Sequence, residues 1–165
     1  MAATYEPIAT TTVAVAASSI TFSSIPSTYT DLRLIVVPTS ATNENFALRF
    51  NSDSGTNYSS TRLVGNGSAV SSANFANTTE IQLTSSFYIN ATPTLHTFDI
   101  FSYAGSTYKT FLFDEISDMN GSGGINKQVG LWRSTSAINN IYLFSQGVNL
   151  FAIGTTATLY GIKAA

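Results

Sequence analysis

The chain has 165 residues with 7 basic and 9 acidic side chains, so its formal net charge is −2 and only 10% of its residues are charged. Soluble domains usually carry about 25% charged residues, and this shortage excludes a basic nucleic-acid footprint and a strongly acidic disordered tail. The 44% hydrophobic and 12% aromatic content is enough for one folded domain over residues 1–165. No cysteine is present, which excludes disulfides, thiolate metal sites and a cysteine nucleophile.

The start of the chain, Met1–Pro7, lacks the cationic region of a signal peptide, and no apolar run is long enough to cross a bilayer. We therefore expect neither a cleaved signal nor membrane association. Neutral Ser, Thr and Asn residues stand where Lys and Glu usually would, and they favour strands and turns. Because no window of about 11 residues keeps an apolar period near 3.6, the sequence predicts an all-β protein with no substantial helix.

Short apolar or alternating runs, separated by turn residues, fill the first half of the chain. Leu32–Val37 is the most continuous and is expected to be a central strand buried on both faces. Asn66-Gly67 predicts a tight hairpin turn, followed by a Ser/Ala/Asn-rich connection through Asn77. The strands predicted here are Thr11–Ala17, Ile20–Phe22, Leu32–Val37, Phe46–Phe50 and Tyr58–Val64.

The second half repeats the pattern, with a flexible Gly-Ser loop expected at Asp118–Gly124. The strands predicted here are Glu80–Ile89, Leu95–Tyr103, Lys109–Ile116, Val129–Arg133, Ile138–Phe144, Val148–Ile153 and Thr156–Lys163. With roughly ten strands, no fixed repeat and no linker, an antiparallel β-sandwich of jelly-roll type is the most economical architecture. Residues 1–19 are expected to be an extended arm or an edge strand. Since Lys and Pro are few, the sheet edges are either covered by neighbouring subunits or kept short and bulged.

Candidate reaction centres are sparse. His96 is the sole histidine and lies inside a strand pattern, with no Gly-x-Ser-x-Gly motif to supply a nucleophile and too few nitrogen and sulfur ligands for zinc. Asp114, Glu115, Asp118 and Asp99 could in principle supply a glycosidase-like acid pair. Adjacent residues of a strand point to opposite faces, however, so Asp114 and Glu115 are expected to lie apart. The sequence predicts no catalytic, cofactor or metal site.

Two loops and a set of aromatic residues are candidate binding sites. Asn51–Asn57 is rich in oxygen ligands but lacks the terminal Glu of a calcium loop, and is interpreted as a turn. Gly121–Lys127 resembles a phosphate loop only superficially, because no Ser or Thr follows Lys127 and no helix follows the loop. Trp132, Tyr58 and Tyr103 could form a sugar-stacking surface, although most rings of such a sandwich belong to its core.

Several segments carry a resemblance to a known family. They are Ser24–Leu34, Phe50–Ser59, Asp99–Tyr103 with Lys109 after it, Gly130–Ile138 and Leu159–Ile162. Together they resemble small all-β virion proteins of tailed bacteriophages, a family of structural, decoration and tail-associated proteins. The segments span most of the chain in order, and they form a loose pattern with no catalytic signature. Their residues also have structural interpretations: Gly161, for example, leaves room for Trp132 or another ring against the terminal strand.

The resemblance implies a non-enzymatic virion structural protein, made in the host cytoplasm and carried on the capsid surface as a cement or decoration protein. Its expected partners are the major capsid protein and further copies of itself, with a trimer as the expected homo-oligomer. The alternative is a receptor- or carbohydrate-binding domain of a tail fibre or tail tip, with other tail proteins or a host surface glycan as partners. A glycan-cleaving depolymerase is a third, weaker hypothesis.

Overall fold

The computed structural model describes residues 4–40, 44–83, 92, 94–118, 123–147 and 151–163. Within these ranges the chain forms twelve β-strands and no helix, so the predicted all-β class is confirmed, and the number of strands is close to the roughly ten expected. The strands are β1 (Tyr5–Thr12), β2 (Ser19–Ser23), β3 (Asp31–Val37), β4 (Phe46–Phe50), β5 (Tyr58–Gly65), β6 (Val70–Thr78), β7 (Ile81–Gln82), β8 (Leu95–Phe101), β9 (Lys109–Asp118), β10 (Gly123–Trp132), β11 (Asn140–Ser145) and β12 (Thr156–Ile162).

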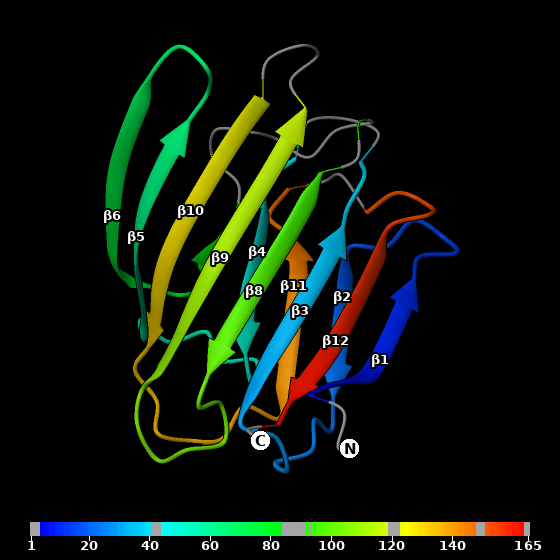
Figure 1. Ribbon diagram of the computed structural model, residues 1–165, viewed down its shortest axis with the longest axis vertical. Helices are drawn as coiled ribbons and strands as arrows, with labels where there is room; N and C mark the ends of the chain where they lie inside the picture. The colour runs from blue at the N-terminus through cyan, green and yellow to red at the C-terminus, as the bar shows by residue number, and fades with distance from the viewer. Residues whose placement is uncertain are drawn as a thin grey trace.

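The strands form two antiparallel sheets (Figure 1). The large sheet has eight strands in the order β1-β12-β3-β8-β9-β10-β5-β6, and the small sheet has four in the order β2-β11-β4-β7. Without the β5–β6 and β9–β10 hairpins, the orders become β1-β12-β3-β8 and β2-β11-β4-β7. Each strand then has its neighbour in the chain at the same place in the other sheet, which is the topology of an eight-stranded jelly roll. The two hairpins widen one sheet of that jelly roll.

The core lies between the two sheets, where inward-facing side chains alternate with outward-facing ones along each strand. In β3, for example, Leu32, Leu34 and Val36 are buried while the residues between them are half-buried. Phe46 and Phe151 stack with ring centroids 4.0 Å apart, and Phe98 and Phe113 lie 4.7 Å apart. Burial of each such side chain stabilises the fold by about 1.5–3 kcal/mol.

Two predictions for the first part of the chain, one about burial and one about a strand boundary, are wrong. The expectation that Leu32–Val37 is buried on both faces fails because only the small sheet covers it; the outer side chains stay partly exposed. The first strand is Tyr5–Thr12, where Thr11–Ala17 was expected, and it pairs with β12 at the edge of the large sheet. The strand contains Pro7, which an edge strand tolerates, and its register shifts between Pro7 and Ala9.

The hairpin turn at Asn66-Gly67 is confirmed. Gly67 has a φ of 83°, and the Asn66 side-chain oxygen accepts hydrogen bonds from the backbone N–H groups of Ser68 and Ala69. The predicted connection after it is instead strand β6, because the turn returns the chain alongside β5 and pairing overrides the weak strand propensity of Ser, Ala and Asn.

Strand β10 begins at Gly123, six residues before the predicted start at Val129. The end of the predicted strand Glu80–Ile89 and the start of Val148–Ile153 lie outside the described residues, as does the centre of the predicted Gly-Ser loop. Of Val148–Ile153, Phe151 forms an isolated bridge with Ala17. The prediction that Gly161 makes room for a ring is confirmed, although the ring is that of Tyr29, whose Cγ lies 2.3 Å from where a Cβ would stand.

Candidate functional site

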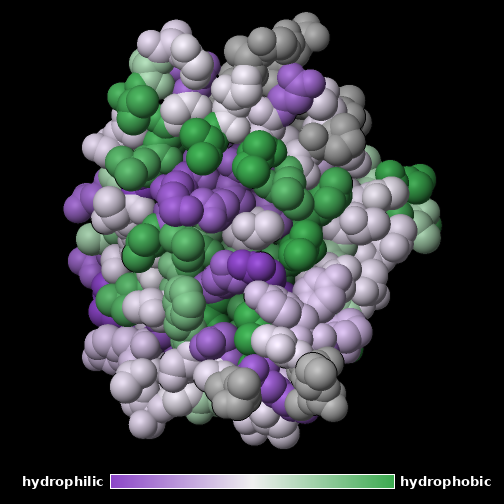
Figure 2. Space-filling model, viewed as in Figure 1, coloured by the Kyte–Doolittle hydropathy of each residue, from purple (hydrophilic) through white to green (hydrophobic). Residues whose placement is uncertain are grey.

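The side of the large sheet that faces away from the small sheet is called the outer face here (Figure 2). Strand alternation places every second residue of β3, β5, β8, β9, β10 and β12 on this face. Because one face of an antiparallel sheet is usually solvated, polar side chains are expected there. The view shows hydrophobic patches over much of this face, separated by bands of hydrophilic residues.

Cross-strand register assembles the apolar side chains into a row. Ile125 of β10 lies opposite Gly65 of β5 and Ile116 of β9, and Ile116 lies opposite Leu95 of β8. Val37 extends the row on β3, because the preceding pair is Val36 with His96. Ile125, Ile116 and Leu95 are 50%, 55% and 39% exposed. This aliphatic row, Ile125, Ile116, Leu95 and Val37, is a contiguous apolar surface of the kind that marks an interaction site.

Charged residues of the outer face are already paired within the chain. Lys127 Nζ lies 2.7 Å from Asp114 Oδ1 across β10 and β9. Arg33 and Asp99 form a two-pronged ion pair across β3 and β8, with N–O distances of 2.5 and 2.6 Å. The hydrogen bonds that Arg33 donates to Asp99 raise the pKa of Arg33 against the opposing effect of burial. Since each cation has its own carboxylate, the face presents little uncompensated charge to a partner.

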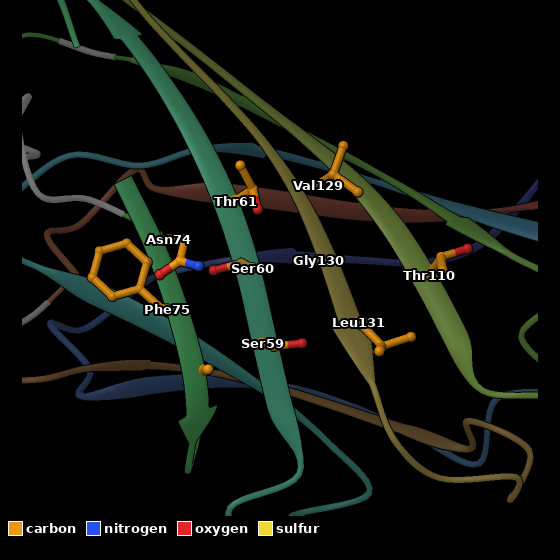
Figure 3. Close-up of a pocket in the computed structure, with 10 residues that line it drawn as sticks. Ser59, Ser60, Thr61, Asn74, Phe75, Thr110, Val129, Gly130 and Leu131 are labelled. Carbon is orange, nitrogen blue, oxygen red and sulfur yellow. The ribbon is translucent and has the colours of Figure 1, made fainter. Parts of the chain in front are cut away.

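A shallow groove of about 410 Å³ crosses the outer face near the β6 edge (Figure 3). Four adjacent strands line it: β6, β5, β10 and the start of β9. Its lining is neutral, with small or hydroxyl side chains beside Val129 and Leu131. The lining residues are Ser59, Ser60, Thr61, Asn74, Phe75, Ala76, Thr110, Val129, Gly130 and Leu131. No charged side chain lines this groove, so the lining has no group to bind an ion or to act as a general acid or base.

Asp114 and Glu115, two of the carboxylates that could supply an acid pair, point to opposite faces as predicted. Asp114 points to the outer face and Glu115 into the interior. Asp99 and Asp114 share the outer face, but each is held by its own cation. Asp118 lies exposed at the end of β9. The arrangement offers no free carboxylate pair on the described part of this face.

His96 is buried. Its Nε2 lies 3.2 Å from Thr94 Oγ1 and 3.7 Å from Glu115 Oε1. The side-chain amide of Asn126 donates hydrogen bonds to Glu115 Oε2 and to the backbone oxygen of Leu83, both at 3.1 Å. These residues join the inner faces of β8, β9 and β10 into a buried polar layer.

Two further members of this layer are under-satisfied. Neither side-chain polar atom of Gln128, nor Nε of Arg62, has a hydrogen-bond partner among the described residues. Burial lowers the pKa of Arg62, while the charge of Glu115 opposes that shift. The guanidinium stacks 4.9 Å from the Phe75 ring centroid. An unpaired buried polar group costs about 1–3 kcal/mol, so this layer reduces the stability of the β5–β10 region.

The three aromatic residues predicted to bind a ligand are all in the core, so that interpretation is corrected. Trp132 is 2% exposed, and Tyr58 and Tyr103 are fully buried. Trp132 packs 5.7 Å from Phe50 and 6.4 Å from Tyr58, measured between ring centroids. The Tyr103 hydroxyl donates to the backbone oxygen of Pro26. Residue type suggested binding, but burial leaves no ring face for a sugar.

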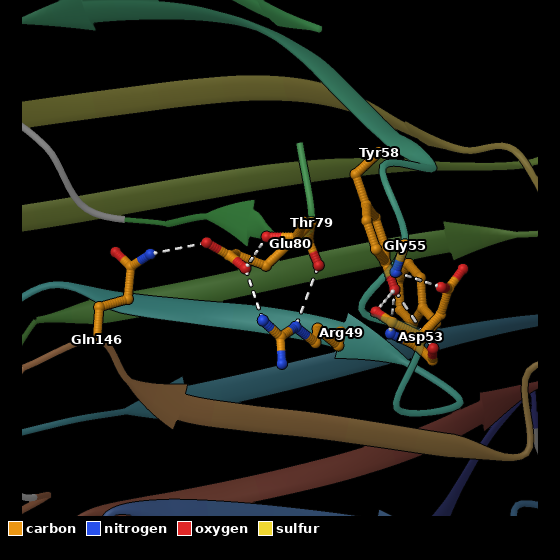
Figure 4. Close-up of polar contacts among 8 residues, drawn as sticks. Arg49, Asp53, Gly55, Tyr58, Thr79, Glu80 and Gln146 are labelled. Carbon is orange, nitrogen blue, oxygen red and sulfur yellow. Dashed lines mark hydrogen bonds and ion pairs between the residues drawn. The ribbon is translucent and has the colours of Figure 1, made fainter. Parts of the chain in front are cut away.

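The oxygen-rich turn Asn51–Asn57 is held by protein contacts (Figure 4). Asp53 accepts hydrogen bonds from Trp132 Nε1 at 2.7 Å, from the Asn57 side chain at 2.9 Å and from Gly55 N at 2.8 Å. Partial burial would raise the pKa of Asp53, but these hydrogen bonds outweigh it and hold the pKa below its ordinary value. The described residues contain no group of three or more His, Asp or Glu side chains placed to hold a metal ion.

A partly exposed aromatic pair, missed by the sequence reasoning, lies on the small sheet. Tyr142 and Phe144 of β11 stack with centroids 5.0 Å apart, and Arg49 lies over the Phe144 ring at 4.8 Å. Figure 4 shows Arg49 also bonded to Glu80 Oε2 at 2.8 Å and to the backbone oxygen of Thr79. Tyr142 and Phe144 are two residues apart in the sequence, and residues with this spacing share one face of a strand. That spacing could have indicated the pair.

The fold and the outer face together define an all-β jelly-roll sandwich with an exposed apolar surface. No family model, curated protein or solved structure matches the chain. Over the described ranges, no helix is long and apolar enough to cross a membrane.

Proposed function

We propose that this chain is a non-enzymatic structural subunit that binds another protein through the outer face of its large sheet. The aliphatic row carries the proposal. Burial of apolar surface contributes about 25 cal/mol per Å², and the row offers exposed side chains from β8, β9 and β10 beside a partly exposed one from β3. The outer-face ions are paired within the subunit, so a partner that covers them removes few uncompensated charges from water.

The sequence resemblance gives this assembly its proposed setting, the virion of a tailed bacteriophage. There the chain is proposed to be a capsid cement or decoration protein, with the major capsid protein and further copies of itself as partners. A cement protein works through many equivalent contacts, so that avidity replaces strong individual binding. A surface of neutral polar and aliphatic side chains suits this mode, since each contact adds modest affinity without desolvating unpaired ions.

The test is binding of purified chain to capsids that lack it, with bound copies counted by quantitative mass spectrometry. The double variant Ile116→Ser/Ile125→Ser removes two members of the aliphatic row, and we expect at least a tenfold weaker affinity. Ile153→Ser is the matched control, because Ile153 is also exposed but lies outside the outer-face strands. Hundreds of wild-type copies per particle indicate a capsid protein, and a few to a few tens indicate a tail protein. Unchanged affinity of the double variant would disprove binding through the outer face.

The second candidate function, carbohydrate binding by a tail fibre or tail tip, has one observation in its favour. The stacked pair Tyr142 and Phe144 lies partly exposed near the middle of the small sheet. Aromatic rings suit contact with the apolar faces of sugars. Titration with host surface polysaccharide tests it: saturable binding that Tyr142→Ala abolishes supports the site, and no binding by the wild type eliminates it.

A further inference from the structure

The two edges of the large sheet differ in how they meet solvent. An unpaired edge strand exposes backbone N–H and C=O groups and can add a strand from another chain unless charge, proline or a bulge blocks it. At one edge, β1 carries Glu6 and Pro7 and has a register shift between Pro7 and Ala9. This edge therefore has three of the protections that discourage further pairing.

At the other edge, β6 lacks charge and proline, and its irregularity is confined to its C-terminal end, where the register skips Asn77, whose φ is 55°. Its sequence, Val70-Ser-Ser-Ala-Asn-Phe-Ala-Asn-Thr78, contains neither a charged residue nor proline, and six of its nine residues are exposed. On one side it pairs with β5, with a register shift only near Tyr58. On its other side no described strand pairs with it, and Figure 1 shows β6 at the end of the sheet. A long, neutral and open edge is a template for strand addition.

Charge and symmetry favour a second copy of the same strand as the occupant. Two identical strands that pair antiparallel about a two-fold axis bring equivalent residues face to face, so any charge near the axis would meet its like. A neutral strand avoids this repulsion. With the axis at Asn74, the central residue of β6, Asn74 lies opposite its equivalent and Ala73 lies opposite Phe75 of the second copy. Small and amide side chains then meet across the junction.

The remaining edges do not suit a ring built from two different strand edges. Such head-to-tail pairing, including a trimer of this kind, needs a second open edge comparable with β6. The protections of β1 were described above, β2 has five residues, and β7 has two. Among the described strands, β6 can therefore pair over most of its length only with another β6.

We propose that β6 pairs antiparallel with β6 of a second copy about a two-fold axis at Asn74, which joins two eight-stranded sheets into one continuous sheet. The pairing leaves the aliphatic row uncovered, so each dimer presents two outer faces to further partners. The proposal adds a self-association site to the proposed assembly function. Its test needs only the purified chain, so failure of β6 pairing and failure of capsid binding give separate results.

The absence of native cysteine makes cross-linking specific. Asn74→Cys places one thiol on each copy, and opposed residues of an antiparallel pair have Cα atoms about 4.5–5.5 Å apart, within the range that a disulfide spans. We expect most of the variant to become a covalent dimer under mild oxidation. Thr10→Cys, exposed on the protected β1 edge, is the matched control and should stay largely uncross-linked. Equal cross-linking of the two variants would overturn the proposal.

Sedimentation equilibrium supplies a test that needs no cross-link. The wild type should dimerise, and Ser72→Lys, which places charge on the exposed edge, should raise the dimer dissociation constant at least tenfold. Thr61→Lys adds the same charge to β5, on the same face but inside the sheet, and should change that constant less than twofold. A monomeric wild type would overturn the proposal, and a strand of a different protein would then be the remaining partner for the β6 edge. A trimeric mass would also overturn the proposal.

Discussion

Asp53 shows how far residue type alone can carry an inference. The sequence places Asp53 in a turn that resembles a calcium loop. It also places Trp132 in a set of aromatic residues that could bind sugar. The structure joins the two, because the Trp132 indole donates to Asp53 from 79 positions further along the chain. No local pattern encodes that contact. Residue types indicated that Asn51–Asn57 is a turn, but they could not show that the Asp53 carboxylate also anchors a core tryptophan.

The first prediction concerns Asp53→Asn. The asparagine keeps the size of the side chain but loses the charge-assisted hydrogen bonds from Trp132, Asn57 and Gly55. We expect the free energy of unfolding at pH 7 to fall by about 1–2 kcal/mol, as measured by urea denaturation followed through Trp132 fluorescence.

The pH dependence provides an internal check. The pKa of Asp53 in the folded state is lowered, so its contribution to stability is fully present above the unfolded pKa of about 3.9 and is lost as the pH falls through the lower folded-state pKa. The difference between the wild type and Asp53→Asn should therefore shrink on acidification. Asp114→Asn is the control, since its exposed ion pair contributes about 0–1 kcal/mol. A difference that persists after Asp53 has become protonated would contradict this account.

At the level of strands, alternation was predictable and register was not. The opposite orientations of Asp114 and Glu115 follow from their adjacency in a strand, and the structure confirms them. The aliphatic row, in contrast, joins Ile116, Ile125 and Leu95 from three strands. Which residues meet across strands depends on turns and pairing over long sequence separations. Strand β6 was missed for the same reason, because β5 and the turn define it more than its own residues do.

Two glycines of β10 give a test of packing within one strand. A Cβ at Gly130 would stand 1.6 Å from the Phe111 ring, whereas a Cβ at Gly123 would meet nothing within 4 Å. We expect Gly130→Ala to lower the free energy of unfolding by about 1–3 kcal/mol, because overpacking displaces the Phe111 ring. Gly123→Ala should be within about 0.5 kcal/mol of the wild type, as usual for a surface substitution. Equal effects of the two variants in thermal unfolding would contradict the packing role of Gly130.

At the scale of the whole molecule, the fold provides two separate surfaces for contact with other chains, the edge strand β6 and the aliphatic row on the outer face. The two hairpins added to the jelly roll widen the large sheet, and they supply both its open edge, β6, and Ile116 and Ile125 of the aliphatic row. The composition of the chain suits both contacts, since neutral polar and aliphatic side chains can be covered without desolvating ions. The low charge of the chain is evident from the sequence. Which surface this low charge makes suitable for binding could be identified only from the order of the strands in the sheet.

Salt dependence distinguishes this mode of assembly from an electrostatic one. The outer-face ion pairs, Lys127 with Asp114 and Arg33 with Asp99, form within the subunit, so association creates few new charge contacts that salt could screen. We expect the affinity for capsids to change less than about threefold between 0.05 and 0.5 M NaCl, a range over which the Debye length falls well below 10 Å. The measurement is the number of chains that stay bound when loaded particles are sedimented at each salt concentration. If moderate salt released most of the chains, charge complementarity rather than the aliphatic row would have to supply the binding energy.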